Sequence, residues 1–230
     1  MTLRKTYVGM ELVEQYDYRH FGGAAGRYVF EKDIAILTSL LRPPPGLVID
    51  VPCGTGIYSE RLRNAGYDVV AADASLPMLE MAGRRKVGML RMLSDINALP
   101  FPEGSFDAIM TIRLFQHYPR ADVARMLGEL RRVIKPDGLI VFDTFRWTPR
   151  SLPVVRSFLP RNTMVVWASR DVEMLIRNAG LRKVREASCY LFSPIWQRKL
   201  PLPVVKGLSA LEGVLPQPWL LRTFWACTHE

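Results

Sequence analysis

The chain has 230 residues, 49% of them hydrophobic and 23% charged, which excludes a disordered chain and suits one domain with a substantial core. Its formal charge of +9 makes nucleic acid, an anionic membrane surface and an acidic ligand candidate partners. Three cysteines without paired spacing argue against disulfides or a metal site. With no signal-peptide pattern and no apolar run of about 18 residues, we expect a cytoplasmic protein.

Residues 1–45 are predicted to be mainly helical. Apolar residues recur at helical spacing from Phe30 to Leu41, so this stretch has one face that can pack on a core. The helix must stop at Pro43–Pro45, because proline cannot continue it.

Residues 46–145 alternate short apolar runs with amphipathic segments. Strands are expected at 47–51, 68–72, 89–93, 106–111 and 139–145, and helices near 57–65, 76–83 and 121–134. Such alternation is typical of βαβ units, whose parallel strands are buried on both faces. A turn is expected at Pro136–Gly138, just before the fifth strand.

Residues 146–230 differ in character. Helices are expected near 170–179 and 203–213, and strands near 181–192 and 219–228. The connection 146–169 is long and contains three prolines, and connections of that length often serve as lids or binding loops.

A glycine-rich loop, Asp50–Gly56, follows the first predicted strand and opens a helix. Gly54 and Gly56 allow tight turning and close approach of the backbone to a ligand, and the helix that follows presents unpaired N–H groups. Nicotinamide, flavin and SAM enzymes all use such loops. The dinucleotide fingerprint is incomplete here, because a third glycine is missing.

Asp73 ends the second predicted strand, 17 residues after Gly56. An acid at that position can accept hydrogen bonds from both ribose hydroxyls of an adenosyl group. The alternative is a helix N-cap, since the next helix begins directly afterwards.

Several motifs together carry a family resemblance. They are Asp50–Gly56, Asp73–Leu79, Ser94–Phe101, Ser105–Asp107, Arg113–Pro119 and Leu130–Leu139. In this order the chain resembles the class I S-adenosylmethionine (SAM)-dependent methyltransferases, most closely the small-molecule branch that includes the ubiquinone and menaquinone methyltransferases. The resemblance implies an α/β Rossmann-like fold: a seven-stranded, mostly parallel sheet in the order 3-2-1-4-5-7-6, with helices on both faces and an antiparallel last strand.

The resemblance also implies one methyltransferase domain over 1–230. It comprises a helical lid (1–45), a SAM-binding core (46–145) and an acceptor-shaping part (146–230). SAM is the implied cofactor and S-adenosylhomocysteine the product. The implied cofactor contacts are Asp50, Cys53, Gly54 and Gly56 at the methionine end, Asp73 and Ala74 at the ribose, Met78, Asp95 and Ile96 at the adenine, and Thr111 beside the sulfonium. Tyr16 and Arg27 are further candidates for the carboxylate of SAM, although Arg27 also suits a solvated helix.

Two residues of the loop need comment. Pro52 stands where family members often have glycine, so the first turn of the loop must differ. Cys53 invites a nucleophile interpretation, but a buried loop cysteine is more often a small packing residue.

His117 and Arg113 are the candidate catalytic residues. His117 follows the fourth strand and suits a general base at neutral pH, or it caps the short helix there. Arg113 lies closer to the strand end, where it pairs with an anionic acceptor or fixes a loop.

The C-terminal part carries most of the positive charge, with 13 Lys and Arg against 5 Asp and Glu from residue 146 onward. This part is expected to shape the acceptor pocket. Core packing explains most of its aromatic residues, which are Trp147, Phe158, Trp167, Tyr190, Phe192 and Trp196. We expect a small-molecule or lipid-like acceptor, hydrophobic and anionic, with an anionic membrane surface as a further partner. An RNA (tRNA) methyltransferase and a non-catalytic scaffold are the alternatives.

Overall fold

A computed structural model describes residues 13–41, 46–85, 89–146, 165–191 and 194–230. Its strands are β1 (Leu47–Asp50), β2 (Asp68–Asp73), β3 (Leu90–Leu93), β4 (Phe106–Thr111), β5 (Ile134–Arg146), β6 (Val166–Trp167), β7 (Leu181–Cys189) and β8 (Arg222–His229). Its longer helices are α2 (Tyr16–Phe21), α3 (Gly23–Leu40), α4 (Ile57–Asn64), α5 (Leu76–Gly83), α6 (Arg120–Val133), α8 (Ser169–Asn178) and α10 (Leu202–Glu212). Short helices lie at Phe115–His117, α9 (Pro194–Gln197) and Gln217–Trp219.

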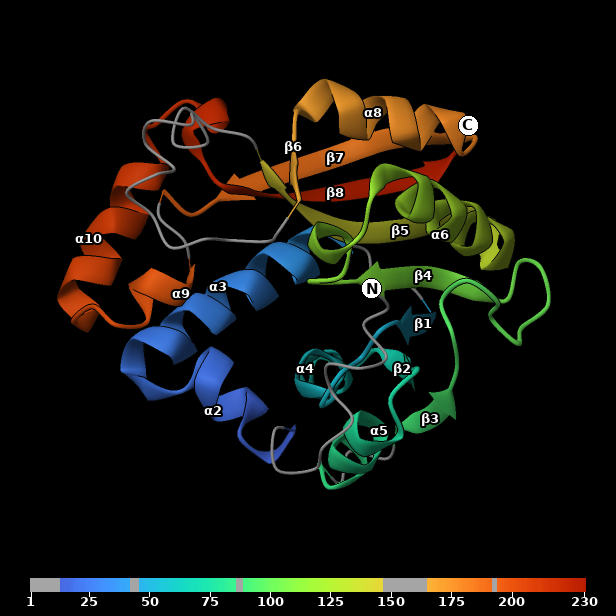
Figure 1. The fold of residues 1–230 in the computed structure, drawn as a ribbon, viewed down its shortest axis with the longest axis horizontal. Coiled ribbons are helices and arrows are strands. Elements are labelled where there is room, and N and C mark those ends of the chain that lie inside the picture. Colours follow the sequence, from blue (N-terminus) through green and yellow to red (C-terminus); the bar gives the residue numbers. More distant parts are fainter. Residues whose placement is uncertain (1–12, 42–45, 86–88, 147–164, 192–193) are drawn as a thin grey trace.

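The strands form one sheet in the order β3-β2-β1-β4-β5-β8-β7, and β6 pairs with β5 outside this path (Figure 1). Strands β1 to β5 pair in parallel, whereas β8 is antiparallel to both of its neighbours. The predicted topology is confirmed, since the last strand inserts beside β5. The sequence did not predict the two-residue β6, which makes the sheet eight-stranded.

Both faces of the sheet are covered, as Figure 1 shows. Neighbouring residues of one strand point to opposite faces. Ile49 and Phe142 belong to the core beneath α6 and α8, whereas Val48 and Val141 belong to the core beneath α3 and α4. The continuous apolar runs of the sequence therefore exist because each strand is buried twice.

The predicted turn at Pro136–Gly138 is found inside β5. Phe106 pairs with Ile134 and Ala108 pairs with Leu139, so residues 135–138 bulge out opposite a single residue, Asp107. The Pro-Asp-Gly sequence therefore forms a bulge within the strand rather than a turn before it. Regular pairing with β4 continues from Leu139 onward.

One buried ionic network joins the N-terminal helix to the C-terminal strand. Arg222 Nη1 donates to Asp33 Oδ2 of α3 at 2.7 Å, and its Nε donates to Asp143 Oδ2 of β5 at 2.6 Å. Tyr190 Oη and Tyr58 Oη also donate to Asp33, at 2.5 and 2.8 Å. Segments that are distant in sequence thus converge on the ion pair of Asp33 and Arg222.

We predict that Arg222→Met destabilises the protein by about 3–5 kcal/mol, because it leaves two buried carboxylates without their cation. Urea unfolding followed by circular dichroism measures this change. Arg170→Gln, at an arginine side chain that is 87% exposed, is the control and should alter stability by less than about 0.5 kcal/mol. Similar losses for the two variants would contradict a central role for the network.

Candidate functional site

A cavity of about 620 Å³ opens where β1, β2 and β4 end. The carboxyl ends of parallel strands meet at this edge. The strand order reverses at β1, which has β2 on one side and β4 on the other. In open α/β sheets such a switch point is where ligands bind. The volume is in the range of small-molecule sites.

The glycine-rich loop forms one wall of the cavity. Gly54 has φ of 55° and Gly56 φ of 74°, so both adopt the left-handed backbone that glycine tolerates. A Cβ on Gly56 would also lie 2.8 Å from Ala82 Cβ of α5. The Val51–Pro52 peptide bond is cis, and Cys53 N still donates to Ala72 O of β2 at 2.8 Å. The proline is therefore accommodated within the loop.

Asp73 lies at the base of the cavity and holds the loop in place. Its Oδ2 accepts from Gly54 N and its Oδ1 from Ser75 N, each at 2.8 Å. The second bond closes a turn just before α5, whose N-cap is Ser75, so the N-cap alternative for Asp73 is wrong. A carboxylate has about four acceptor positions, so two remain for a ligand. Burial raises the pKa of Asp73.

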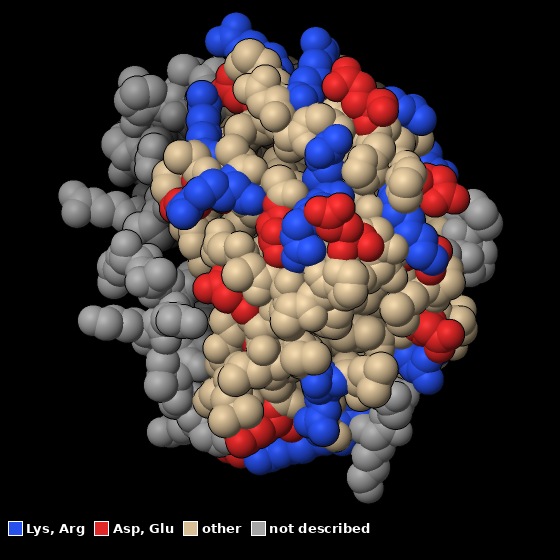
Figure 2. All heavy atoms as spheres, turned by 90° about the vertical axis from the view of Figure 1, so that its right-hand side faces the viewer, with Lys and Arg blue, Asp and Glu red and all other residues tan. Residues whose placement is uncertain are grey.

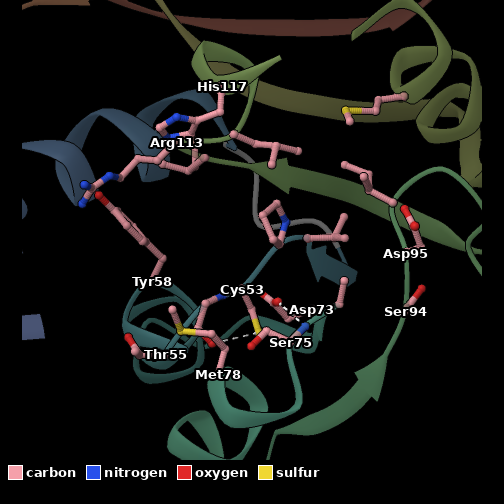
Figure 3. Close-up of a pocket in the computed structure, with 18 of the residues that line it drawn as sticks. Cys53, Thr55, Tyr58, Asp73, Ser75, Met78, Ser94, Asp95, Arg113 and His117 are labelled. Atoms are coloured by element: carbon pink, nitrogen blue, oxygen red, sulfur yellow. Dashed lines mark hydrogen bonds between the residues drawn. The ribbon is translucent and has the colours of Figure 1, made fainter. Parts of the chain in front are cut away.

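Ser94 and Asp95 lie together on another side of the cavity, away from Cys53 and Met78 (Figure 3), and Ile96 also lines it. Asp95 Oδ1 accepts from the backbone and the side-chain amide of Asn97, at 3.0 and 2.8 Å. The buried Ser94 Oγ has no hydrogen-bond partner among the described residues. Sequence reasoning missed Ser94, because a serine after a strand carries no signal of its own.

Four of the predicted cofactor residues do not line the cavity: Asp50, Gly56, Thr111 and Arg27. Thr111 is buried at the end of β4, and Arg27 is exposed on α3 as in the solvated-helix alternative. Asp50 lies behind the loop, where it accepts a hydrogen bond from Ser59 Oγ. The remaining predicted cofactor residues, Tyr16, Cys53, Gly54, Asp73, Ala74, Met78, Asp95 and Ile96, all line the cavity.

The candidate catalytic residues also reach the cavity. Arg113 has φ of 62°, and its backbone N–H donates to Asp143 Oδ1 at 2.6 Å. Its guanidinium lies 5.3 Å from the ring centre of Phe21 and 5.9 Å from that of Tyr16. Partial desolvation and then the charge of Arg113 lower the pKa of His117, which leaves the imidazole neutral near pH 7.

Cys53 is not an activated nucleophile. It is buried, and desolvation followed by the nearby carboxylates of Asp50 and Asp73 raises its thiol pKa well above the ordinary value. A neutral thiol is a poor nucleophile, so the packing interpretation holds.

Two aromatic residues of the C-terminal part can be placed. Trp167 and Tyr190 are fully buried in the two cores and do not line the cavity, as the core-packing interpretation predicts. Trp147, Phe158 and Phe192 lie outside the described residues, as does the side chain of Trp196. Hydrophobic character alone does not distinguish a core aromatic from a pocket aromatic.

A polar clasp joins α2 to the glycine-rich loop. Thr55 Oγ1 donates to Asp17 Oδ1 at 2.5 Å, and Arg85 Nε donates to Thr55 O at 2.6 Å. Arg85 also forms ion pairs with Asp17 and Glu60. Helix α2 is therefore fixed over the loop. Sequence reasoning did not predict the contacts of Asp17, Thr55 and Arg85 that hold it there.

Fold and site together define a class. The strand order, the antiparallel β8 and the glycine loop followed by an acidic strand end are those of Rossmann-like methyltransferases. The family described as "Methyltransferase domain" matches residues 49–142, which confirms the predicted resemblance.

The chain is similar to several known proteins. It is 34% identical over 142 residues to malonyl-[acyl-carrier protein] O-methyltransferase of Salmonella typhimurium, covering 59% of this chain and 55% of that protein. It is 42% identical over 102 residues to demethylmenaquinone methyltransferase of Renibacterium salmoninarum, covering 44% and 42%. The chain thus spans about half the length of these relatives.

Solved structures share the fold. Magnesium protoporphyrin IX methyltransferase from Synechocystis PCC 6803, crystallised with bound SAH, superposes with a TM-score of 0.63 at 16% identity, covering 90% of this chain and 84% of that one. At that identity the likeness establishes the fold alone.

We predict that Asp50→Asn stabilises the protein more at high pH than at low pH. Burial raises the pKa of Asp50 from 3.8 to about 7. The folded state therefore holds a proton that the unfolded state has released, and stability falls as pH rises from about 4 to 7. Asparagine does not titrate and can still accept from Ser59.

The expected advantage of Asp50→Asn grows from near zero at pH 4 to at most about 4 kcal/mol at pH 8. Urea unfolding at several pH values measures it, with Asp68→Asn on the exposed end of β2 as the control. A difference that does not change with pH would show that Asp50 has an ordinary pKa.

Proposed function

We propose that this protein is a SAM-dependent methyltransferase, with S-adenosylhomocysteine as the product. The observation that carries the proposal is Asp73, an acid that lines the cavity at the switch point of the sheet and is bonded to the glycine loop. The match of residues 49–142 to the methyltransferase family and the SAH bound to the structural neighbour support it.

The cavity residues suit SAM in one orientation. Met78 and Ile96 offer apolar surface to the adenine, and Asp95 and Ser94 offer polar atoms to its edge. Asp73 has acceptor positions for both ribose hydroxyls. Gly54 and Thr55 lie just before α4, and the N–H groups in the first turn of that helix suit a carboxylate. Tyr16 lines the same cavity.

Bound SAM would supply a methyl group that is already activated, so the protein mainly positions the acceptor and excludes water. Tyr16 and Phe21 of α2 cover the cavity, and the clasp through Asp17 and Thr55 holds them there. These contacts of α2 support 1–45 as a lid over a core at 46–145. The acceptor-shaping role of 146–230 stays a prediction, because none of its described residues lines the cavity. The neutral His117 suits a base where the acceptor must lose a proton.

The acceptor is proposed to be a small molecule or a lipid-like molecule. The cavity wall beyond the loop is largely apolar, with Phe21, Ile112, Leu114 and Met126 among its residues. The curated relatives are named for acyl-carrier-bound malonyl and for demethylmenaquinone, which are small groups rather than nucleic acid.

Some of the basic side chains of the C-terminal part, which suggested RNA, are paired within the protein. Lys183 forms ion pairs with Glu173 and Glu186, and Arg222 is shared by Asp33 and Asp143. On the face drawn in Figure 2, acidic and basic side chains are interspersed. These contacts favour a small acceptor over RNA.

Peripheral contact with an anionic membrane is the second part of the proposal. Val204, Leu211 and Val214 follow one another at helical spacing along α10 and the turn after it, and all are exposed. The exposed Trp219 and Lys206 lie in the same region of the chain. Apolar side chains beside lysine and tryptophan suit a membrane interface. In the part of the chain that the structure describes, no helix is long and apolar enough to cross a membrane.

We predict that Asp73→Ala weakens SAM binding at least tenfold while the fold persists, because hydrogen bonds to a charged group contribute about 1.5–3 kcal/mol. Isothermal calorimetry with SAM and with SAH measures it. Asp68→Ala, at the exposed start of the same strand, is the control and should not change affinity.

Because Asp73 also holds the loop, a second ligand pair separates its two roles. Methylthioadenosine should bind Asp73→Ala more weakly than wild type, whereas its 2′,3′-dideoxy form should bind both about equally. Unchanged SAM affinity in Asp73→Ala would overturn the proposed placement of the ribose.

We predict that the protein binds vesicles rich in phosphatidylglycerol at low salt and that Leu211→Asp reduces this binding several-fold. The substitution places a carboxylate where apolar surface would enter the interface. Met174→Asp, at an exposed apolar residue of α8, is the matched control. Vesicle sedimentation measures the effect, and equal binding by the two variants would exclude α10 as the contact.

A further inference from the structure

The guanidinium of Arg113 lies at the acceptor end of the cavity, with a more distant arginine, Arg198, outside its lining. Arg113 lines the cavity just after β4, and His117 lines it four residues later. Arg198, directly after α9, lies close enough to Arg113 that the two charges act on each other, and both act on His20 of α2. Desolvation, followed by these charges, lowers the pKa of His20 to about 4.

The guanidinium of Arg113 has no carboxylate partner among the described residues. The guanidinium lies over the aromatic rings of Tyr16 and Phe21, and the backbone N–H of Arg113 donates to Asp143. Asp33 and Asp143, the carboxylates nearest to this end, are already engaged by Arg222. Arg198 likewise forms no ion pair within the described part of the chain.

Among the residues that the structure describes, Arg113 lacks a negative partner within ion-pair distance. Asp33 and Asp143 both pair with Arg222, so neither forms an ion pair with the Arg113 guanidinium. A partly buried guanidinium without a counter-ion is costly, and residues that recognise carboxylates are arranged in this way. One monovalent anion would balance the site.

We propose that this end of the cavity is an anion subsite, in which Arg113 pairs with a single carboxylate of the methyl acceptor and Arg198 adds a second positive charge. The inference rests on the proposed function, because it assigns the acceptor class of the same cavity. Phe21, Ile112 and Leu114 line the cavity beside Arg113, so the acceptor is an apolar molecule that carries one carboxylate.

The shape of Arg113 supports this role. Its positive φ and the bond from its N–H to Asp143 fix the backbone, and Asp143 is itself held by Arg222. The two rings hold the guanidinium without using up its hydrogen-bond donors in the way a carboxylate would. Arg222 and Asp143 are therefore positioning residues for the anion subsite.

The competing assignment is the carboxylate of the cofactor itself. Figure 3 shows Arg113 and His117 on one wall of the cavity, and Cys53, Thr55 and Met78 on the opposite wall. In the orientation proposed above, the cofactor carboxylate lies at the Gly54–Thr55 loop, beside the start of α4. Arg113 is then left for the acceptor.

Octanoate and octanol are suitable probes, because they share an alkyl chain and differ in charge. Binding to the SAH-loaded protein is measured by calorimetry at pH 7.5. We expect octanoate to bind at least tenfold more tightly than octanol. Arg113→Gln removes the charge but keeps a long polar side chain, and it should remove this preference. Arg198→Gln should reduce the preference several-fold.

Arg113→Lys retains a charge and should keep part of the preference, which separates anion binding from a general loss of structure. Arg19→Gln, at an exposed arginine of α2, is the matched control and should leave octanoate binding unchanged. Thermal unfolding of each variant checks that the fold is intact.

Three results would overturn the inference. Equal affinities of the wild-type protein for octanol and octanoate would mean that no anion subsite exists. Arg113→Gln that weakens SAH but not methylthioadenosine, which lacks the carboxylate, would assign Arg113 to the cofactor. Unchanged octanoate binding in Arg113→Gln would place the anion elsewhere. A wild-type protein that fails to bind SAH would instead refute the proposed function, which the SAH titration reports separately.

Discussion

Arg222 is a guanidinium removed from water at the centre of the molecule, and its neutralisation brings distant parts of the chain together. Asp33 comes from the N-terminal helix α3, and Asp143 comes from the middle strand β5. An unpaired charge in this position would cost several kcal/mol, so both carboxylates must be present when the fold forms. Asp143 then accepts the backbone N–H of Arg113. The geometry of the cavity wall thus depends on a contact with the last strand.

A second constraint acts on the other side of the cavity. Asp73 bonds to Gly54, and the clasp of Asp17, Thr55 and Arg85 joins the same loop to α2. Each bond satisfies a polar group that burial would otherwise leave without water. The glycine loop is therefore held from below by a strand end and from above by a helix. It is positioned before a ligand arrives, which reduces the entropy that binding must overcome.

The two halves of the cavity offer different groups to a ligand. The loop, Asp73 and Asp95 offer acceptors and a free helix start, which suit an adenosyl group with a charged tail. Arg113 and His117 offer donors beside apolar walls. Many folds of this class share the first half, and the acceptor differs among them, so the second half is where this protein gains its own specificity.

The sheet, and the place of the glycine loop and Asp73 in the cavity, could be predicted from the sequence. Strand burial on both faces produces apolar runs, and glycines with positive φ and an acid at a strand end are local requirements that leave a local pattern. Tertiary structure alone decided that Asp50 and Thr111 lie behind the wall, that Trp167 and Tyr190 belong to the core, and that Asp17 and Arg85 clasp the loop. Those outcomes depend on pairings across the chain, such as Asp33 with Arg222, 189 positions apart. No local spacing encodes such a contact, because burial and charge compensation are properties of the packed whole.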